Sequence, residues 1–135
     1  MISPQRSFHA RDLPNGARQE ITATSRSIWL RWVCDDRVTR AIYLNVDDFD
    51  LLDAALTRIG GPRIAHVATI QKTPGVNLKI FAGLGTIVVK LHCHVGGMLH
   101  GSFYLEGEEV VALKQAMSHL RNTAAPAASQ KEGTP

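Results

Sequence analysis

Two stretches of the chain, residues 28–59 and 89–120, share one pattern of alternating strands followed by a helix. When they are aligned without a gap, apolar residues fall on apolar residues, although few positions are identical. The aligned apolar pairs are Leu30 with Leu91, Ile42 with Phe103, Leu44 with Leu105, Phe49 with Val110, Leu52 with Leu113, Leu56 with Met117 and Ile59 with Leu120. Self-similarity at a fixed spacing is typical of a repeated structural unit. The sequence therefore predicts two copies of one unit.

Each copy begins with two alternating runs that predict a β-hairpin. Leu30 lies between Trp29 and Arg31, and Leu91 lies between Lys90 and His92 in the matching run of the second copy. Alternation with period two is typical of a strand with one buried face. The runs are separated by residues 35–37 and 96–98, a length that suits a hairpin with a bulge.

The three-residue loops also predict a strand register that keeps apolar residues on one face. The predicted apolar pairs are Leu30 opposite Ile42 and Leu91 opposite Phe103, and the predicted pairs on the other face are Trp29 opposite Tyr43 and Lys90 opposite Tyr104. A register slip of one residue would turn every side chain to the opposite face. The apolar pattern therefore excludes that slip.

A helix is predicted after each hairpin. Asp47–Asp48 and Glu108–Glu109 stand where the amino end of a helix favours negative charge. Apolar residues then recur at helical spacing and form one stripe for each helix. Residues 60–62, Gly-Gly-Pro, end the first helix. Each helix must cover the apolar face of its own hairpin or of its partner's.

Two further strands are predicted before each hairpin, at 6–13 and 17–24 in the first copy and at 63–71 and 76–82 in the second. We therefore predict an α+β protein of two pseudo-repeated ββββα units, with antiparallel sheets that are each covered by a C-terminal helix. The first half spans residues 1–61 and the second spans 62–121, and together they form one compact domain. Residues 122–135 are small and polar, and are predicted to form a flexible tail.

Composition sets broad limits on the class of protein. A chain of 135 residues suits one domain or two small halves that share a core. It has no apolar run near the ~20 residues that span a bilayer, and residues 1–12 lack the apolar stretch of a secretion signal. We expect a soluble cytoplasmic protein without membrane contact. Cys34 and Cys93 are predicted to be reduced core thiols, because their spacing suits neither zinc nor a redox pair.

The order of four strands and a helix, twice in tandem, resembles the Whirly fold. Each half alone resembles the positive-cofactor-four type of single-stranded-DNA-binding transcriptional coactivator, which pairs as a dimer. The resemblance covers residues from about 5 to 121 by pattern, and its most specific parts are AIYLNVDDFDLL at 41–52 and GSFYLEGEEVVAL at 101–113. It implies binding of single-stranded nucleic acid, without catalytic residues, in transcription regulation or DNA metabolism.

The sheet face turned away from the helices independently predicts a nucleic-acid partner. If Leu30 and Leu91 point into the core, alternation places cations and aromatic rings on the other face. These candidate binding residues are Trp29, Arg31, Tyr43, Lys79, Phe81, Lys90, His92 and Tyr104. Rings stack on bases at about 1–3 kcal/mol per base, and cations neutralise the backbone. The net charge of +3 permits such a partner, and we expect a weak sequence preference.

Other uses of this face stay open. It could pack against another sheet or subunit, with the Arg31 stem reaching solvent. It could also belong to a protein-interaction or inhibitor module of phage or plasmid type, which grips a protein partner through the sheet face or the C-terminal tail. Free edge strands in a tandem fold favour a homo-oligomer in each case.

Three histidines predict a metal-dependent enzyme as a second alternative. His92 and His94 are two apart on one strand, and His100 is predicted to lie opposite His94. Three imidazoles with an open position suit zinc or iron. However, the neighbouring outward positions offer no carboxylate to orient the rings, as such sites usually require. We therefore expect no cofactor and no catalysis.

Overall fold

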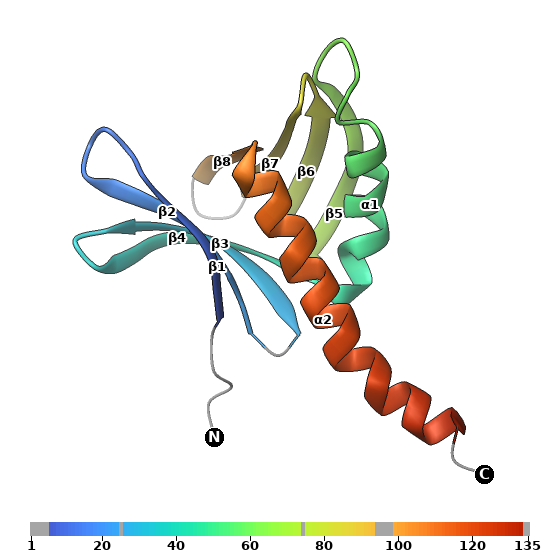
Figure 1. Ribbon diagram of the computed structural model, residues 1–135. Coiled ribbons are helices and arrows are strands. Elements are labelled where there is room, and N and C mark those ends of the chain that lie inside the picture. The colour runs from blue at the N-terminus through green and yellow to red at the C-terminus, as the bar shows by residue number, and fades with distance from the viewer. Residues whose placement is uncertain (1–5, 25, 74, 94–98, 134–135) are drawn as a thin grey trace. The chain divides into compact units, whose positions relative to one another are not determined.

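The computed structural model describes residues 6–24, 26–73, 75–93 and 99–133, and within them it has two four-stranded antiparallel sheets and two α-helices (Figure 1). The first sheet contains β1 (Arg6–Asp12), β2 (Ala17–Ala23), β3 (Ser27–Cys34) and β4 (Arg37–Asn45). The second contains β5 (Ala65–Thr73), β6 (Val76–Gly83), β7 (Thr86–Cys93) and β8 (Leu99–Glu106). A short 3-10 helix, η1 (Val46–Asp48), precedes α1 (Phe49–Thr57), and α2 spans Glu108–Gly133. The α+β class is confirmed.

The contacts within the chain group the residues into two compact units. One unit contains Met1–Asp47 and Val111–Pro135, and the other contains Asp48–Val110. The first sheet therefore shares a unit with most of α2, and the second sheet shares a unit with α1. The sequence predicted that each helix covers either its own hairpin or that of the other half. An apolar helical stripe does not specify which of two apolar sheet faces it will cover, so the pattern left this choice open.

In the second unit, α1 packs against β5 and β6. Phe49 and Leu52 of the helix, and Leu78 and Ile80 of β6, are all buried. The start of the helix is also tied to the sheet, because Lys72 Nζ on β5 lies 2.6 Å from Asp48 Oδ2, and both side chains are largely buried. The second sheet therefore has one face covered by α1 and the opposite face turned away from it.

In the first unit, the apolar core runs across three neighbouring strands. Ile21, Leu30 and Ile42 are adjacent in the β2–β3–β4 register and are at most 2% exposed. The helix α2 meets β1 through His119, whose ring lies 5.7 Å from that of Phe8 and within 3.3 Å of an Arg6 guanidinium nitrogen. The alternation along β3 places Trp29 and Arg31 on the face opposite this core.

The β3–β4 hairpin keeps the predicted pairs but has a shorter loop. Leu30 lies opposite Ile42 and Trp29 opposite Tyr43, as predicted. The strands close through a two-residue turn at 35–36, where both aspartates have positive φ, and the register shifts near Trp32. A two-residue turn with both φ values positive matches the right-handed twist of the strands. Cys34, next to this turn, is a free thiol and is only half-buried, which corrects the prediction of a core thiol.

The β7–β8 register differs from the predicted one by two residues. Leu91 lies opposite Gly101, Lys90 opposite Ser102 and Val88 opposite Tyr104, so the predicted pairing of Leu91 with Phe103 and of Lys90 with Tyr104 is wrong. A shift of two leaves every side chain on its predicted face, so an alternating pattern does not distinguish the two registers. The same shift sets His100 opposite His92 rather than opposite His94.

The tip of the β6–β7 hairpin is bonded to the segment that follows α1. The backbone N–H of Leu84 donates to Gly61 O at 2.9 Å, and that of Gly85 donates to Ile59 O at 2.7 Å. The chain passes so close at this point that a Cβ on Gly83, where φ is +154°, would lie 1.9 Å from the carbonyl oxygen of Arg63. This contact holds the β6–β7 end of the second sheet beside the α1–β5 connection.

The helix α2 begins with Glu108 and Glu109, in agreement with the predicted acidic start. It continues to Gly133, through residues for which the sequence predicts a flexible tail. Within the described part of the chain, neither helix is long and apolar enough to cross a membrane.

Candidate nucleic-acid interface

The face of the second sheet opposite α1 carries three cross-strand rows of residues that are polar or aromatic, apart from the buried Val88. The alternation with buried Leu78 and Ile80 assigns these rows to that face. The rows are His66–Phe81–Val88–Tyr104, Thr69–Lys79–Lys90–Ser102 and Gln71–Asn77–His92–His100. Five of the predicted binding residues therefore share one surface, which we call the lysine face: Lys79, Phe81, Lys90, His92 and Tyr104.

Two lysines stand directly opposite each other at the centre of the lysine face. Lys79 on β6 is the ladder partner of Lys90 on β7. Like charges in directly opposed positions destabilise a sheet. Among the outward positions of β6, β7 and β8 that the structure describes, Glu106 at the end of β8 is the one carboxylate, opposite Thr86. The centre of the face is therefore positively charged, at some expense of stability.

Aromatic rings lie beside this charge. Phe81 is one residue row away from the lysine pair, and Lys90 Nζ lies 5.1 Å from the centroid of its ring. The His66 ring meets Phe81 edge to face, with centroids 5.3 Å apart. Tyr104 belongs to the same row and is 49% exposed. The row therefore offers rings to a planar ligand next to two cations.

The first sheet carries the other three predicted residues on the face opposite its core. The rings of Trp29 and Tyr43 are cross-strand partners with centroids 5.2 Å apart and planes inclined by 36°. Arg31 follows Trp29 on the same face and has Ala41 as its partner on β4. All three side chains are partly exposed. This second surface, the tryptophan face, again combines rings with a cation.

No protein-family model, curated protein or solved structure matches this chain.

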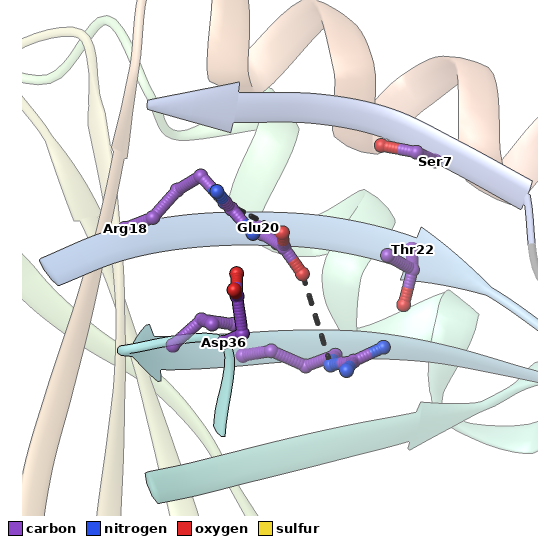
Figure 2. Close-up of a pocket in the computed structure, with 7 residues that line it drawn as sticks. Ser7, Arg18, Glu20, Thr22 and Asp36 are labelled. Atoms are coloured by element: carbon purple, nitrogen blue, oxygen red, sulfur yellow. Dashed lines mark hydrogen bonds and ion pairs between the residues drawn. The ribbon is translucent and has the colours of Figure 1, made fainter. Parts of the chain in front are cut away.

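The tryptophan face also contains two adjoining pockets. One, of about 320 Å³, is lined by side chains that include Ser7, Arg18, Glu20, Thr22, Arg31 and Asp36 (Figure 2). The other, of about 330 Å³, is lined by Thr24, Trp29, Arg31, Val38 and Ala41. Arg31 lines both pockets. The first is mainly polar, and the second is the more apolar.

The histidines predicted as metal ligands are only partly described. His92 is half-buried on the lysine face and His100 is its partner on β8, whereas His94 lies outside the described residues. In the described ranges, no group of three or more His, Cys, Asp or Glu side chains is placed to hold a metal ion.

The sequence-based prediction did not include four residues that belong to these surfaces. His66 was missed because a register shift between His66 and Ala68 breaks the alternation of β5, so that counting back in twos from Thr69 leads to Val67 instead. The others, Arg18, Glu20 and Thr22, alternate along β2 with the buried Gln19 and Ile21. That alternation was visible, but the prediction considered only aromatic and basic positions of β3 and β4 there.

Proposed function

We propose that this protein binds single-stranded DNA or RNA through the lysine face, with the tryptophan face as a second contact surface. The observation that carries the proposal is the direct opposition of Lys79 and Lys90 beside the Phe81 row. A like-charge pair weakens the sheet that contains it. A polyanion bound at this face would supply the opposite charge, and this explains why the sheet contains the lysine pair.

The mechanism combines phosphate neutralisation with stacking. The two ammonium groups attract the phosphates of a strand that crosses β6 and β7. The neighbouring rings of Phe81 and Tyr104 offer flat surfaces to unpaired bases. Stacking accepts any base, so this face favours single strands without reading their sequence. A duplex offers phosphates but keeps its bases stacked inside, so it gains only the electrostatic part.

The likeness of the two sheets supports a finer proposal about the fold. Each unit has four antiparallel strands in sequential order, and the chain enters a helix with an acidic start after each sheet. We propose that the halves are a Whirly-like internal repeat. The strands at the sheet edges, β1, β4, β5 and β8, offer sites for homo-oligomer pairing. A cytoplasmic role in transcription regulation or DNA metabolism follows from this proposal.

A salt-series titration tests the function. We expect fluorescence anisotropy of a labelled thymine 20-mer to show binding at low salt, with log affinity falling linearly against log salt. The slope expected is about −0.7 for each neutralised phosphate, so two lysines alone give about −1.4. The same sequence as a duplex is the control and should bind more weakly. Absence of binding at 25 mM salt would contradict the proposal and favour the protein-interaction module.

A further inference from the structure

We infer that the polar pocket of the tryptophan face is a specificity site for a guanine base, and this inference rests on the proposed binding of single strands. The stacking surface of the second sheet tolerates any base. The pocket differs from that stacking surface in chemistry, because it brings two carboxylates, two guanidinium groups and two hydroxyls together on the first sheet.

The two oxygens of the Glu20 carboxylate lie at different distances from the two neighbouring guanidinium groups. Oε2 accepts a bond from Arg18 Nε at 2.7 Å. Oε1 lies 3.9 Å from Arg31 Nε, which is too long for a hydrogen bond. The Glu20 side chain is only 16% exposed. A carboxylate oxygen is a strong acceptor for a ligand that carries N–H groups.

The Thr22 hydroxyl is a second polar group of this pocket, and it lacks a hydrogen-bond partner among the described residues. Thr22 is 5% exposed, and its Oγ1 is buried without a hydrogen-bond partner among the described residues. Figure 2 shows Thr22 and Glu20 on the same strand, with the hydroxyl and the carboxylate both directed to the side where β3 lies. A buried polar group without a partner costs free energy. A ligand that forms a hydrogen bond with this hydroxyl would recover that free energy.

The balance of charge selects an uncharged ligand for this pocket. Arg18 and Arg31 are matched by Glu20 and by Asp36 at its rim, so the lining has no net charge. A phosphate gains little here, whereas a polar ring with both donors and acceptors can bond both kinds of group. The volume of about 320 Å³ is at the lower end of the range for small-molecule sites and is sufficient for a single base.

Among the bases, guanine matches these groups best. Its Watson–Crick edge presents two adjacent N–H donors to a carboxylate, and its O6 and N7 accept from an arginine, the commonest specific contact to a base. Adenine and cytosine each offer one amino donor beside an acceptor, which would face Glu20 unfavourably. The geometry therefore pairs the guanine N1 and N2 groups with Glu20, and O6 or N7 with Arg31 or Thr22.

The test compares thymine octamers in which one central base is guanine, inosine, adenine or cytosine. We expect the guanine oligonucleotide to bind wild type about tenfold tighter than the adenine or cytosine one, the ratio expected for one good bidentate contact. Inosine lacks the N2 amino group and should fall between them. Glu20→Gln should abolish the preference, measured as the affinity for the guanine octamer relative to that for the all-thymine octamer. Glu106→Gln, a carboxylate on the other sheet, is the matched control and should retain the preference.

Two further arms keep the outcomes distinct. Thr22→Val preserves shape and should reduce the guanine preference even if Glu20→Gln fails to fold. Guanosine monophosphate alone, titrated by calorimetry against adenosine monophosphate, separates a free nucleotide from a base within a strand.

Equal affinity of wild type for all four octamers would overturn the pocket while single-strand binding stands. If no octamer binds at low salt the proposed function fails, and saturable guanosine monophosphate binding that Glu20→Gln removes would still support the pocket. If the protein binds neither an octamer nor guanosine monophosphate, the guanine pocket is overturned as well.

Discussion

Replacing both central lysines, in Lys79→Gln/Lys90→Gln, should lower affinity for a thymine 20-mer by roughly 50- to 100-fold at 50 mM salt. The figure follows from the salt dependence of single-strand binding, in which each lost phosphate contact removes about 0.7 from the log–log slope. The slope itself should become shallower by about 1.4. Anisotropy titrations at four or five salt concentrations measure both quantities.

The same variant should not be less stable than wild type. Lys79 and Lys90 are directly opposed in the β6–β7 ladder, so their removal relieves repulsion worth a few tenths of a kcal/mol up to about 1 kcal/mol. Binding and stability are therefore expected to change in opposite directions, which a variant that merely unfolds cannot produce. Lys114→Gln removes one positive charge from an exposed position of α2, so it is the control for net charge in each single variant, Lys79→Gln and Lys90→Gln. An equal loss of affinity in the control would contradict a specific role of the lysine pair.

Gly83→Ala should destabilise the protein by about 2–5 kcal/mol. The new methyl group would lie 1.9 Å from Arg63 O, and the φ of +154° is one that residues with a side chain rarely adopt. Relief of the overlap requires the hairpin tip to separate from the α1–β5 connection. Separation would weaken the bonds from Leu84 and Gly85 to Gly61 and Ile59. Urea unfolding followed by circular dichroism measures the loss.

Gly85→Ala is the matched control for that prediction. Gly85 also has positive φ, at +77°, but a Cβ there meets nothing within 4 Å. The Gly85→Ala variant should therefore lose only about 1 kcal/mol of stability, which comes from the backbone conformation alone. Equal losses in the two variants would show that the close approach at Gly83 contributes nothing.

The elements of the fold were predictable because each was marked by a period. The two-residue alternation of Trp29, Leu30 and Arg31 predicted β3 and its outward face, and the acidic pair at Glu108 predicted the start of α2. The register of the first hairpin was also predicted at Leu30 and Ile42. These features depend on local pattern, which the sequence carries directly.

The features that were wrong, missed or left open depend on longer-range geometry. The β7–β8 register was displaced by two because alternation is unchanged by that shift, and Lys90 consequently faces Ser102 rather than Tyr104. The choice of sheet for α1 depends on tertiary packing that no helical stripe encodes. The pocket at Glu20 and Thr22 depends on side-chain burial and hydrogen bonding across β2 and β3. Composition and alternation alone indicate none of these three features.

The central claim is that the lysine face contacts single strands. The most direct measurement is a ¹⁵N amide NMR titration of the protein with a thymine octamer at low salt. The predicted result is saturable shift changes centred on residues 79–81, 88–92 and 102–104, with smaller changes near Trp29 and Tyr43 and little change along α1. Shift changes confined to α1 or α2, or none at saturating oligonucleotide, would contradict it.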